Sequence, residues 1–309
     1  MDLMAAGLST RYSTSDVAVD GGLLRVAVWE PGGPAQGPVP TVLAIHGITA
    51  NHLCWPLLAQ ALPDVRIVAP DLRGRGRSNA LPGPYGMTAH ADDMARVLHA
   101  TGTDRAVVVG HSMGAFVSMV TADRHPDLVR SLVLVDGGLP LLPPPGVDDE
   151  QVVRAILGPA AQRLSTTFSD KAAYQAFWRK HPAFAQDWNE VVTDYVDYDL
   201  YGSEPKLRPC TSYDAVLADS RDLSSGESLL GAIERLRHPV RLLLAPRGLL
   251  NEVPPLYPEA ALRYWRGQLP QIAMSTVTDV NHYTIVMHER GIVRVADAVR
   301  EALNRPDAM

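Results

Sequence analysis

The chain has 309 residues, enough to bury a large core either as one large domain or as a domain that carries an insertion. An apolar content of 46% and a charged content of 20% are typical of a soluble globular protein. Its 28 basic and 34 acidic residues give a formal net charge of −6, which argues against a general binder of nucleic acids or of anionic membranes.

The sequence carries no signal for export or membrane insertion. The N-terminus lacks the basic segment followed by an apolar core that a signal peptide needs. No apolar run reaches the roughly 18 residues of a membrane span. The two cysteines, Cys54 and Cys210, do not indicate a disulfide framework. We therefore expect a soluble, cytoplasmic protein.

Short apolar runs bounded by Gly, Pro and Asp alternate with helical patterns, which predicts an α/β fold. The first expected element is an antiparallel hairpin of residues 16–20 and 23–29, joined by Gly21-Gly22. Buried parallel strands are predicted at residues 41–45, 65–69, 106–109, 131–135, 240–245 and 274–277. Helices are predicted at residues 88–100, with Thr88 as the candidate cap, at 116–124 and at 292–303.

The alternation breaks between Leu139 and His238. This segment opens with a Pro-Pro-Pro-Gly run at 143–146, contains no clear strand, and is rich in aromatic residues at helical spacings within 171–179 and 185–196. We interpret it as a helical insertion that covers the C-terminal edge of the sheet, where open α/β sheets bind ligands. The predicted domains are a core of residues 1–138 and 239–309 and a helical cap of residues 139–238.

The segment from Val107 to Phe116 carries the most specific motif. Three valines lead into Gly110-His111-Ser112-Met113-Gly114, and a helix-compatible run follows, so this Gly-x-Ser-x-Gly sequence has the strand–turn–helix context of a nucleophile elbow. A nucleophilic serine sits there at the tip of a tight, strained turn, and the two flanking glycines relieve the crowding. The turn also places Ser112 at a helix N-terminus, where unpaired N–H groups favour developing negative charge.

A catalytic base and an oxyanion hole complete such a site. Of the ten histidines, His282 is the candidate base, because it follows the last predicted strand and fits the chain order serine–acid–histidine. The amide of Met113, directly after the nucleophile, and that of Ile48, in the loop after the third predicted strand, are the candidate oxyanion donors. For His46 and His111 we expect structural roles.

These motifs resemble those of α/β-hydrolase-fold serine hydrolases, in the esterase, lactonase and cofactor-free perhydrolase branch with a helical cap. The matching pieces are His46-Gly47, residues 71–78 (DLRGRGRS), the elbow, residues 132–136 (LVLVD) and Asn281-His282. The resemblance implies a mostly parallel, twisted eight-stranded sheet flanked by helices, with the cap inserted after strand 6, and no cofactor. It also implies that the arginines of 71–78 belong to a family loop and not to a nucleic-acid patch.

The triad acid departs from the family pattern. Family members usually carry an aspartate in a Gly-x-x-Asp loop after the strand predicted at 240–245, but Asn251 stands at that position here. An asparagine can orient a histidine but cannot stabilise the imidazolium by charge. Two carboxylates remain as candidates: Asp136, at the end of the preceding strand, and Glu252, one residue past the usual place.

The expected function is that of a serine hydrolase that cleaves a carboxylic ester, thioester or lactone through an acyl-enzyme on Ser112. The aromatic insertion favours an apolar or aromatic small-molecule substrate, with Trp55, Trp178 and Trp188 as candidate pocket walls. No metal site is expected, because His288-Glu289 lacks a second histidine at ligand spacing. The alternatives are a ligand-binding protein on a hydrolase scaffold, and carbon–carbon bond cleavage or perhydrolysis by the same residues. The sequence does not indicate the oligomeric state.

Overall fold

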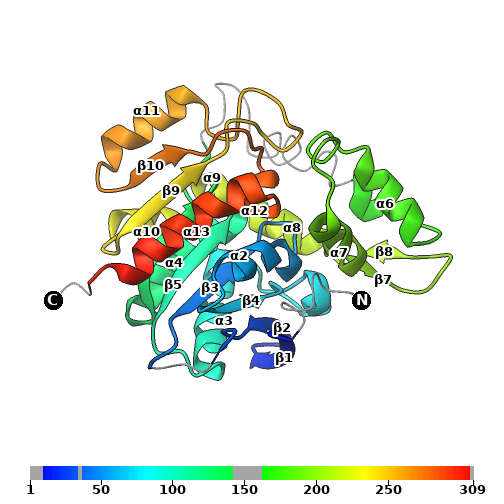
Figure 1. Cartoon of the computed structure of the whole chain (residues 1–309), viewed down its shortest axis with the longest axis horizontal. Helices are drawn as coiled ribbons and strands as arrows, with labels where there is room; N and C mark the ends of the chain where they lie inside the picture. The colour runs from blue at the N-terminus through cyan, green and yellow to red at the C-terminus, as the bar shows by residue number, and fades with distance from the viewer. Residues whose placement is uncertain (1–9, 34–36, 142–161, 307–309) are drawn as a thin grey trace.

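The computed structural model describes residues 10–33, 37–141 and 162–306. Its central element is a twisted sheet of eight strands with helices on both faces, in the order β1-β2-β4-β3-β5-β6-β9-β10 (Figure 1). Six of its strands, β3, β4, β5, β6, β9 and β10, run parallel, whereas β1 pairs antiparallel with β2, and β2 pairs antiparallel with β4. The predicted fold, a mostly parallel eight-stranded α/β sheet, is confirmed.

All eight strands of this sheet lie within a few residues of their predicted positions. They are β1 Tyr12–Val19, β2 Gly22–Trp29, β3 Thr41–Ile45, β4 Arg66–Pro70, β5 Ala106–His111, β6 Val129–Val135, β9 Val240–Leu244 and β10 Ala273–Thr276. The prediction that the strand at 274–277 is buried is wrong. β10 is partly exposed because it is an edge strand with a neighbour on one side only.

Two apolar cores lie on the two faces of the sheet, and successive residues of a strand alternate between them. Val107 and Val109 of β5 belong to one core, whereas Val108 belongs to the other. This double burial is why the central strands have continuous apolar sequences. The first core includes α2 (Pro56–Ala61), α12 (Thr284–Met287) and α13 (Glu289–Asn304), and the second includes α3 (Met87–Ala100), α4 (Met113–Arg124), α10 (Glu227–Glu234) and α11 (Glu259–Gln268).

The start of α3 differs from the prediction in its cap. Thr88 lies inside the first turn, and the N-cap is Gly86, whose φ of 100° requires a glycine-like backbone. The amides at this helix end donate to carboxylates of the inserted segment instead, Gly86 N–H to Asp219 at 2.6 Å and Met87 N–H to Asp222 at 2.9 Å. Sequence patterns detect local caps, so a cap that comes from more than 130 residues away escapes them.

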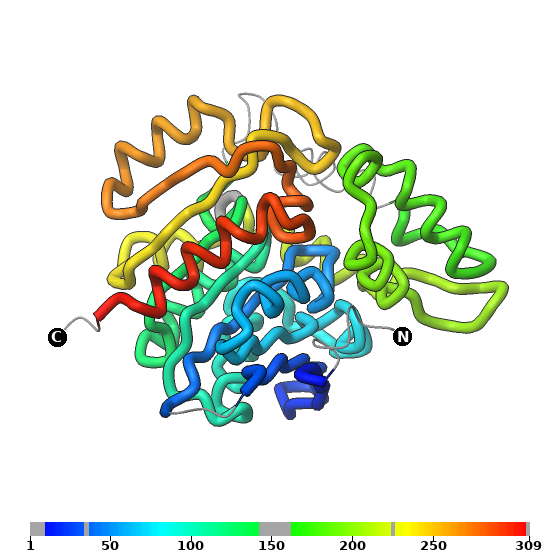
Figure 2. Tube along the Cα trace, in the orientation of Figure 1, coloured from blue at the N-terminus to red at the C-terminus, as the bar shows by residue number. Residues whose placement is uncertain are grey.

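The segment between β6 and β9 forms a lobe beside the sheet, visible in Figures 1 and 2 where α6 (Lys171–Arg179) and α7 (Glu190–Tyr198) project to one side. Helix α6 has the predicted bounds, but α7 begins later than predicted, at the cap Asn189, whose side chain accepts the Val192 N–H. The prediction of no strand is wrong, because Leu200–Tyr201 (β7) pairs with Arg208–Pro209 (β8).

The end of this segment returns to the sheet layers. Helices α8 (Tyr213–Ser220) and α9 (Asp222–Ser225) follow β8, and α10 contacts α4 and α3. The predicted Pro-rich opening at 143–146 lies outside the described residues. In the part of the chain that the structure describes, no helix is both long enough and apolar enough to cross a membrane.

Removal of the Asp222 carboxylate, which caps α3 from the inserted segment, should destabilise the protein more than removal of the Thr88 hydroxyl in the first turn of the helix. Asp222→Ala deletes the carboxylate that accepts the Met87 N–H and is expected to lower the free energy of unfolding by about 1 kcal/mol. Thr88→Ala is the matched control, with an expected change below about 0.5 kcal/mol because this residue makes no capping bond. Urea unfolding of both variants measures the difference, and equal losses would contradict the remote cap.

Candidate active site

Ser112 stands between β5 and α4 in a strained backbone conformation, with φ of 53° and ψ of −123°. The positions two before and two after Ser112 must be glycine, because a Cβ there would clash with neighbouring backbone. A Cβ on Gly110 would lie 2.2 Å from the carbonyl oxygen of Gly114, and a Cβ on Gly114 would lie 2.1 Å from that of Ile45. The Ser112 N–H donates to the carbonyl of Val135 at 2.9 Å, which ties the turn to the end of β6. The structure thus has the tight turn that the Gly-x-Ser-x-Gly spacing predicts.

The structure brings His282 and Asp136 together. His282, in the loop after β10, has its Nδ1 2.7 Å from Oδ2 of Asp136, and both side chains are buried. The other carboxylate oxygen accepts the Ala245 N–H at 3.0 Å, so Asp136 is held from two sides. Since the carboxylate accepts, Nδ1 carries the proton of the neutral ring, and Nε2 is left able to take one.

His111 holds the backbone of the candidate base. Its Nε2 donates to the carbonyl of His282 at 2.7 Å, and the two rings are 4.8 Å apart. Burial, and next the nearby His282, lower the pKa of His111 well below its ordinary value. The ring is therefore neutral at neutral pH and acts as a fixed donor, in line with the structural role expected of it.

Glu252 has no described hydrogen bond or ion pair with His282. Its side chain is exposed and accepts the Leu250 N–H at 2.6 Å, within its own loop. Asn251, at the usual acid position, has a φ of 63° and accepts from Arg247 Nε at 2.7 Å. Its amide oxygen is also 3.3 Å from Nδ2 of Asn281, the residue before the base. Of the two candidate carboxylates, only Asp136 contacts His282.

The loop after β3 lies directly against Ser112. A Cβ on Gly47 would be 3.2 Å from the Ser112 Cβ and 3.6 Å from its Oγ. The carbonyl of Gly47 accepts from Nδ1 of His46 at 2.8 Å and from the Ala50 N–H at 3.2 Å. The Ile48 N–H belongs to the same trans peptide group and so points away from these two donors. On the other side, Met113 is the first residue of α4, whose amide has no intrahelical acceptor.

His46 is fixed in one tautomer by its neighbours. Nε2 accepts the Leu72 N–H at 2.9 Å, so Nδ1 carries the proton that is donated to Gly47. Burial lowers the pKa of His46 to about 4, and the ring is neutral at neutral pH. This agrees with the structural role expected for His46 in bracing the loop.

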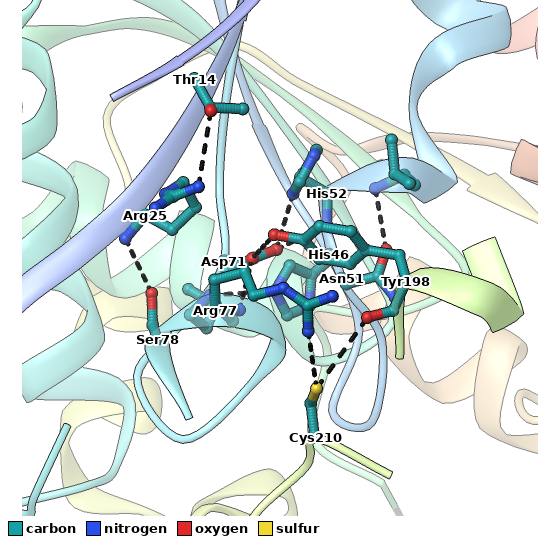
Figure 3. A network of polar contacts seen from close by, with 12 residues as sticks. Thr14, Arg25, His46, Asn51, His52, Asp71, Arg77, Ser78, Tyr198 and Cys210 are labelled. Carbon is teal, nitrogen blue, oxygen red and sulfur yellow. Dashed lines mark hydrogen bonds and ion pairs between the residues drawn. The ribbon is translucent and has the colours of Figure 1, made fainter. Parts of the chain in front are cut away.

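A buried hydrogen-bond network around Asp71 joins the loop after β4 to His52 and to Tyr198 of α7 (Figure 3). One carboxylate oxygen accepts from the backbone N–H and Nδ1 of His52, at 3.0 and 2.8 Å. The other accepts from the Arg77 N–H at 2.9 Å and from the hydroxyl of Tyr198 in α7 at 2.7 Å. Burial alone would raise the pKa of Asp71, but His52 and these hydrogen bonds hold it well below its ordinary value. Only the match of residues 71–78 to a family loop pointed to this network.

The three candidate pocket tryptophans are packed in different ways. Trp55 is fully buried, and Trp178 packs among aromatic residues of the insertion, 6.4 Å from the ring of Tyr283. Trp188 is half-buried, donates to the hydroxyl of Thr193 at 2.9 Å and lies under the Arg179 guanidinium. A role of these residues in binding substrate stays a prediction. Among the described residues, no group of three or more His, Cys, Asp or Glu side chains is placed to hold a metal ion.

Comparisons with known proteins relate this chain to the alpha/beta hydrolase fold family. The model of the alpha/beta hydrolase fold matches residues 40–285. Lipase LipV of Mycobacterium tuberculosis is 42% identical over 118 residues, which is 38% of this chain and 43% of that protein, so this match spans less than half of the lipase. The 2-(acetamidomethylene)succinate hydrolase of Mesorhizobium japonicum is 28% identical over 282 residues, 91% of this chain and 92% of that protein. A crystal structure of E-2-(acetamidomethylene)succinate hydrolase aligns with a TM-score of 0.75 and 24% identity over 95% of this chain and 100% of that chain.

His46 should make the stability of the protein depend on acid pH. Because the pKa of the folded ring is near 4 and its ordinary value is 6.5, the unfolded state binds a proton more readily than the folded state does. The contribution of this residue is fully present above about pH 6.5 and is lost as the pH falls toward 4, by up to roughly 3 kcal/mol.

Urea unfolding of wild-type and His46→Gln protein at about pH 4.5 and pH 7 measures this contribution. The variant is expected to be less stable than the wild type at neutral pH but to lose less stability on acidification. His111 and His181, whose pKa values burial also lowers, are present in both proteins and cancel in the comparison. An equal loss in the two proteins would show that His46 does not carry the effect.

Proposed function

We propose that this chain, which belongs to the alpha/beta hydrolase fold family of enzymes, is a serine hydrolase that cleaves a carboxylic ester, thioester or lactone through an acyl-enzyme on Ser112. The observation that carries the proposal is the buried pair of His282 and Asp136, 2.7 Å apart, at the sheet edge where the strained turn presents Ser112. A strained serine, a histidine whose Nε2 has no hydrogen-bond partner among the described residues and a carboxylate on its Nδ1 are the parts that nucleophilic acyl transfer needs.

In the proposed reaction, Nε2 of His282 takes the proton of the Ser112 hydroxyl as Oγ attacks the substrate carbonyl carbon. The tetrahedral oxyanion accepts hydrogen bonds from the amides of Met113 and Ile48. When the intermediate collapses, His282 returns the proton to the leaving alcohol or thiol and the acyl-enzyme remains. His282 then activates a water molecule, which attacks the ester carbonyl, and Ser112 is regenerated with release of the acid.

Asp136 is the proposed acid of this triad. Its two carboxylate oxygens are used by His282 Nδ1 and the Ala245 N–H, so it both fixes the tautomer of the base and stabilises the imidazolium that forms. Asn251 is neutral, and Glu252 is bound within its own loop. The acid therefore follows β6 in this chain, in place of the usual position after β9.

An apolar or ring-containing substrate is supported by the surroundings of the base. Tyr283, adjacent to His282, packs against Phe184 and Trp178, with ring centroids 5.1 and 6.4 Å apart. Carbon–carbon bond hydrolysis and perhydrolysis by the same residues remain alternatives, as does ligand binding without catalysis. Analysis of the products from a panel of p-nitrophenyl esters and lactones of increasing size separates these possibilities.

Ser112→Ala should abolish hydrolysis, with a loss of about 10⁴- to 10⁶-fold in kcat, because no other group takes over the nucleophile's part. The control is Ser131→Ala, which removes a buried hydroxyl that has no hydrogen-bond partner among the described residues and should leave kcat unchanged. A fluorophosphonate probe is expected to label the wild type and the control but not Ser112→Ala. Unchanged turnover in Ser112→Ala would refute the serine mechanism.

Side-by-side substitution of the two carboxylates tests the acid. Asp136→Asn keeps the shape but not the charge, and should lower kcat by about 10⁴-fold, the loss expected when the base adopts the wrong tautomer. Glu252→Gln should stay within about 3-fold of the wild type, because this side chain has no described contact with His282. Far-UV circular dichroism establishes that both variants are folded, and a larger loss in Glu252→Gln would transfer the role to that residue.

A further inference from the structure

A fully buried arginine lies beneath the proposed oxyanion hole. Arg75, in the loop after β4, donates from Nε to the carbonyl of Ile48 at 2.8 Å. From Nη1 it donates to the carbonyl of Arg73 at 3.0 Å, and its Nη2 is 4.0 Å from the sulfur of Met113. One guanidinium group therefore contacts both residues whose amides are the proposed oxyanion donors.

Asp219, in α8 of the inserted segment, holds this guanidinium in place. Its Oδ2 is 2.5 Å from Nη1 of Arg75 and 3.0 Å from Nε2 of His90, and its Oδ1 accepts the Gly86 N–H at 2.6 Å. Burial alone would raise the pKa of Asp219, but His90 and Arg75 hold it well below its ordinary value. The side chain is thus a carboxylate, and it balances the charge of Arg75 where water does not reach either group.

These contacts restrain Ile48 from both sides. The carbonyl before its amide, that of Gly47, is held by His46 and Ala50, and the carbonyl after it is held by Arg75. With both flanking peptide groups fixed, the Ile48 N–H has one direction available. An oxyanion hole works through donors that are oriented before the reaction begins, so this restraint bears directly on the rate.

We propose that Arg75 and Asp219 are positioning residues of the oxyanion hole: Arg75 orients Ile48 and supports Met113, and Asp219 of the inserted segment orients Arg75. The inference rests on the proposed function, because an oxyanion hole matters only for a reaction with a tetrahedral intermediate. The inserted segment then contributes to the chemical step itself, in addition to any part it has in binding substrate.

The same loop offers a matched control pair. Arg73 and Asp93 form a second buried ion pair, with Nε–Oδ2 at 2.7 Å and Nη2–Oδ1 at 2.8 Å. The other contacts described for the Arg73 guanidinium are with the carbonyls of Pro82 and Asp20, away from Ile48 and Met113, and only its backbone carbonyl accepts from Arg75. Loss of either carboxylate leaves a buried arginine unbalanced, so Asp93→Asn and Asp219→Asn should destabilise the protein to similar extents. Only Asp219→Asn disturbs the proposed oxyanion donors.

The test measures kcat and KM for a p-nitrophenyl ester that the wild type hydrolyses, at a temperature where thermal melts show every variant to be folded. Asp219→Asn should lower kcat by about 10- to 100-fold, less than outright deletion of an oxyanion donor, with KM within about 3-fold of the wild type. Asp93→Asn should keep kcat within about 3-fold. An alkylboronic acid, which forms a tetrahedral adduct with the serine, should bind Asp219→Asn more weakly by the factor that kcat/KM has lost.

Arg75→Lys provides a second variant that keeps the positive charge opposite Asp219 but lacks the forked guanidinium that reaches Ile48 and Met113. It is expected to lose kcat in the same way, and it carries the test if Asp219→Asn does not fold. Equal kcat values for Asp219→Asn and Asp93→Asn, a loss confined to KM, or an unchanged kcat in Arg75→Lys would overturn the inference while Ser112→Ala stays inactive. Hydrolysis by Ser112→Ala would instead remove the proposed function and this inference with it.

Discussion

Backbone segments at the ends of three strands converge on Ser112, so closely that the glycines around it could not carry side chains. A Cβ on Gly137, after β6, would lie 2.2 Å from the carbonyl oxygen of Ser112, and Gly110 and Gly114 are equally crowded. This packing holds Ser112 at a φ of 53°, a conformation that costs a non-glycine residue about 1–3 kcal/mol. The start of α4, the loop at Gly47 and the turn at Asp136 all pack against the backbone around Ser112. The rest of the candidate site therefore depends on this close packing.

Charge burial is the second constraint, and it is concentrated in the loop after β4. Asp71, Arg73 and Arg75 lie within five positions of one another and are almost completely enclosed. Each has a partner of opposite charge or several hydrogen bonds, because an unbalanced charge there would cost several kcal/mol. Two of these partners, Tyr198 and Asp219, come from the insertion, so satisfying the loop's charges also fixes where the insertion docks. Arg75 also donates to the carbonyl of Ile48 in the loop after β3, so that loop shares the restraint.

Much of the fold could be predicted because its determinants are local. Strand apolarity, the glycines of the elbow and the position of His282 after the last strand all depend on short sequence patterns. The errors have non-local causes. The cap of α3 comes from Asp219 and Asp222, and the short ladder of β7 and β8 has too few residues to show a period. The choice between Asp136 and Glu252 depends on which loop reaches the imidazole in three dimensions, and spacing along the chain does not contain that information.

The proposed change of acid position has a simple geometric basis. β6 and β9 are parallel neighbours, so their carboxyl ends lie side by side, and a carboxylate at the end of either strand can approach a histidine that arrives from β10. In this chain Ala245, the residue directly after β9, donates its N–H to Asp136. In the proposed triad, the end of the strand that usually precedes the acid therefore orients the carboxylate that follows its neighbour. Asn251 and Glu252, which the proposed triad does not use, make contacts within their own loop, with Arg247 and Leu250.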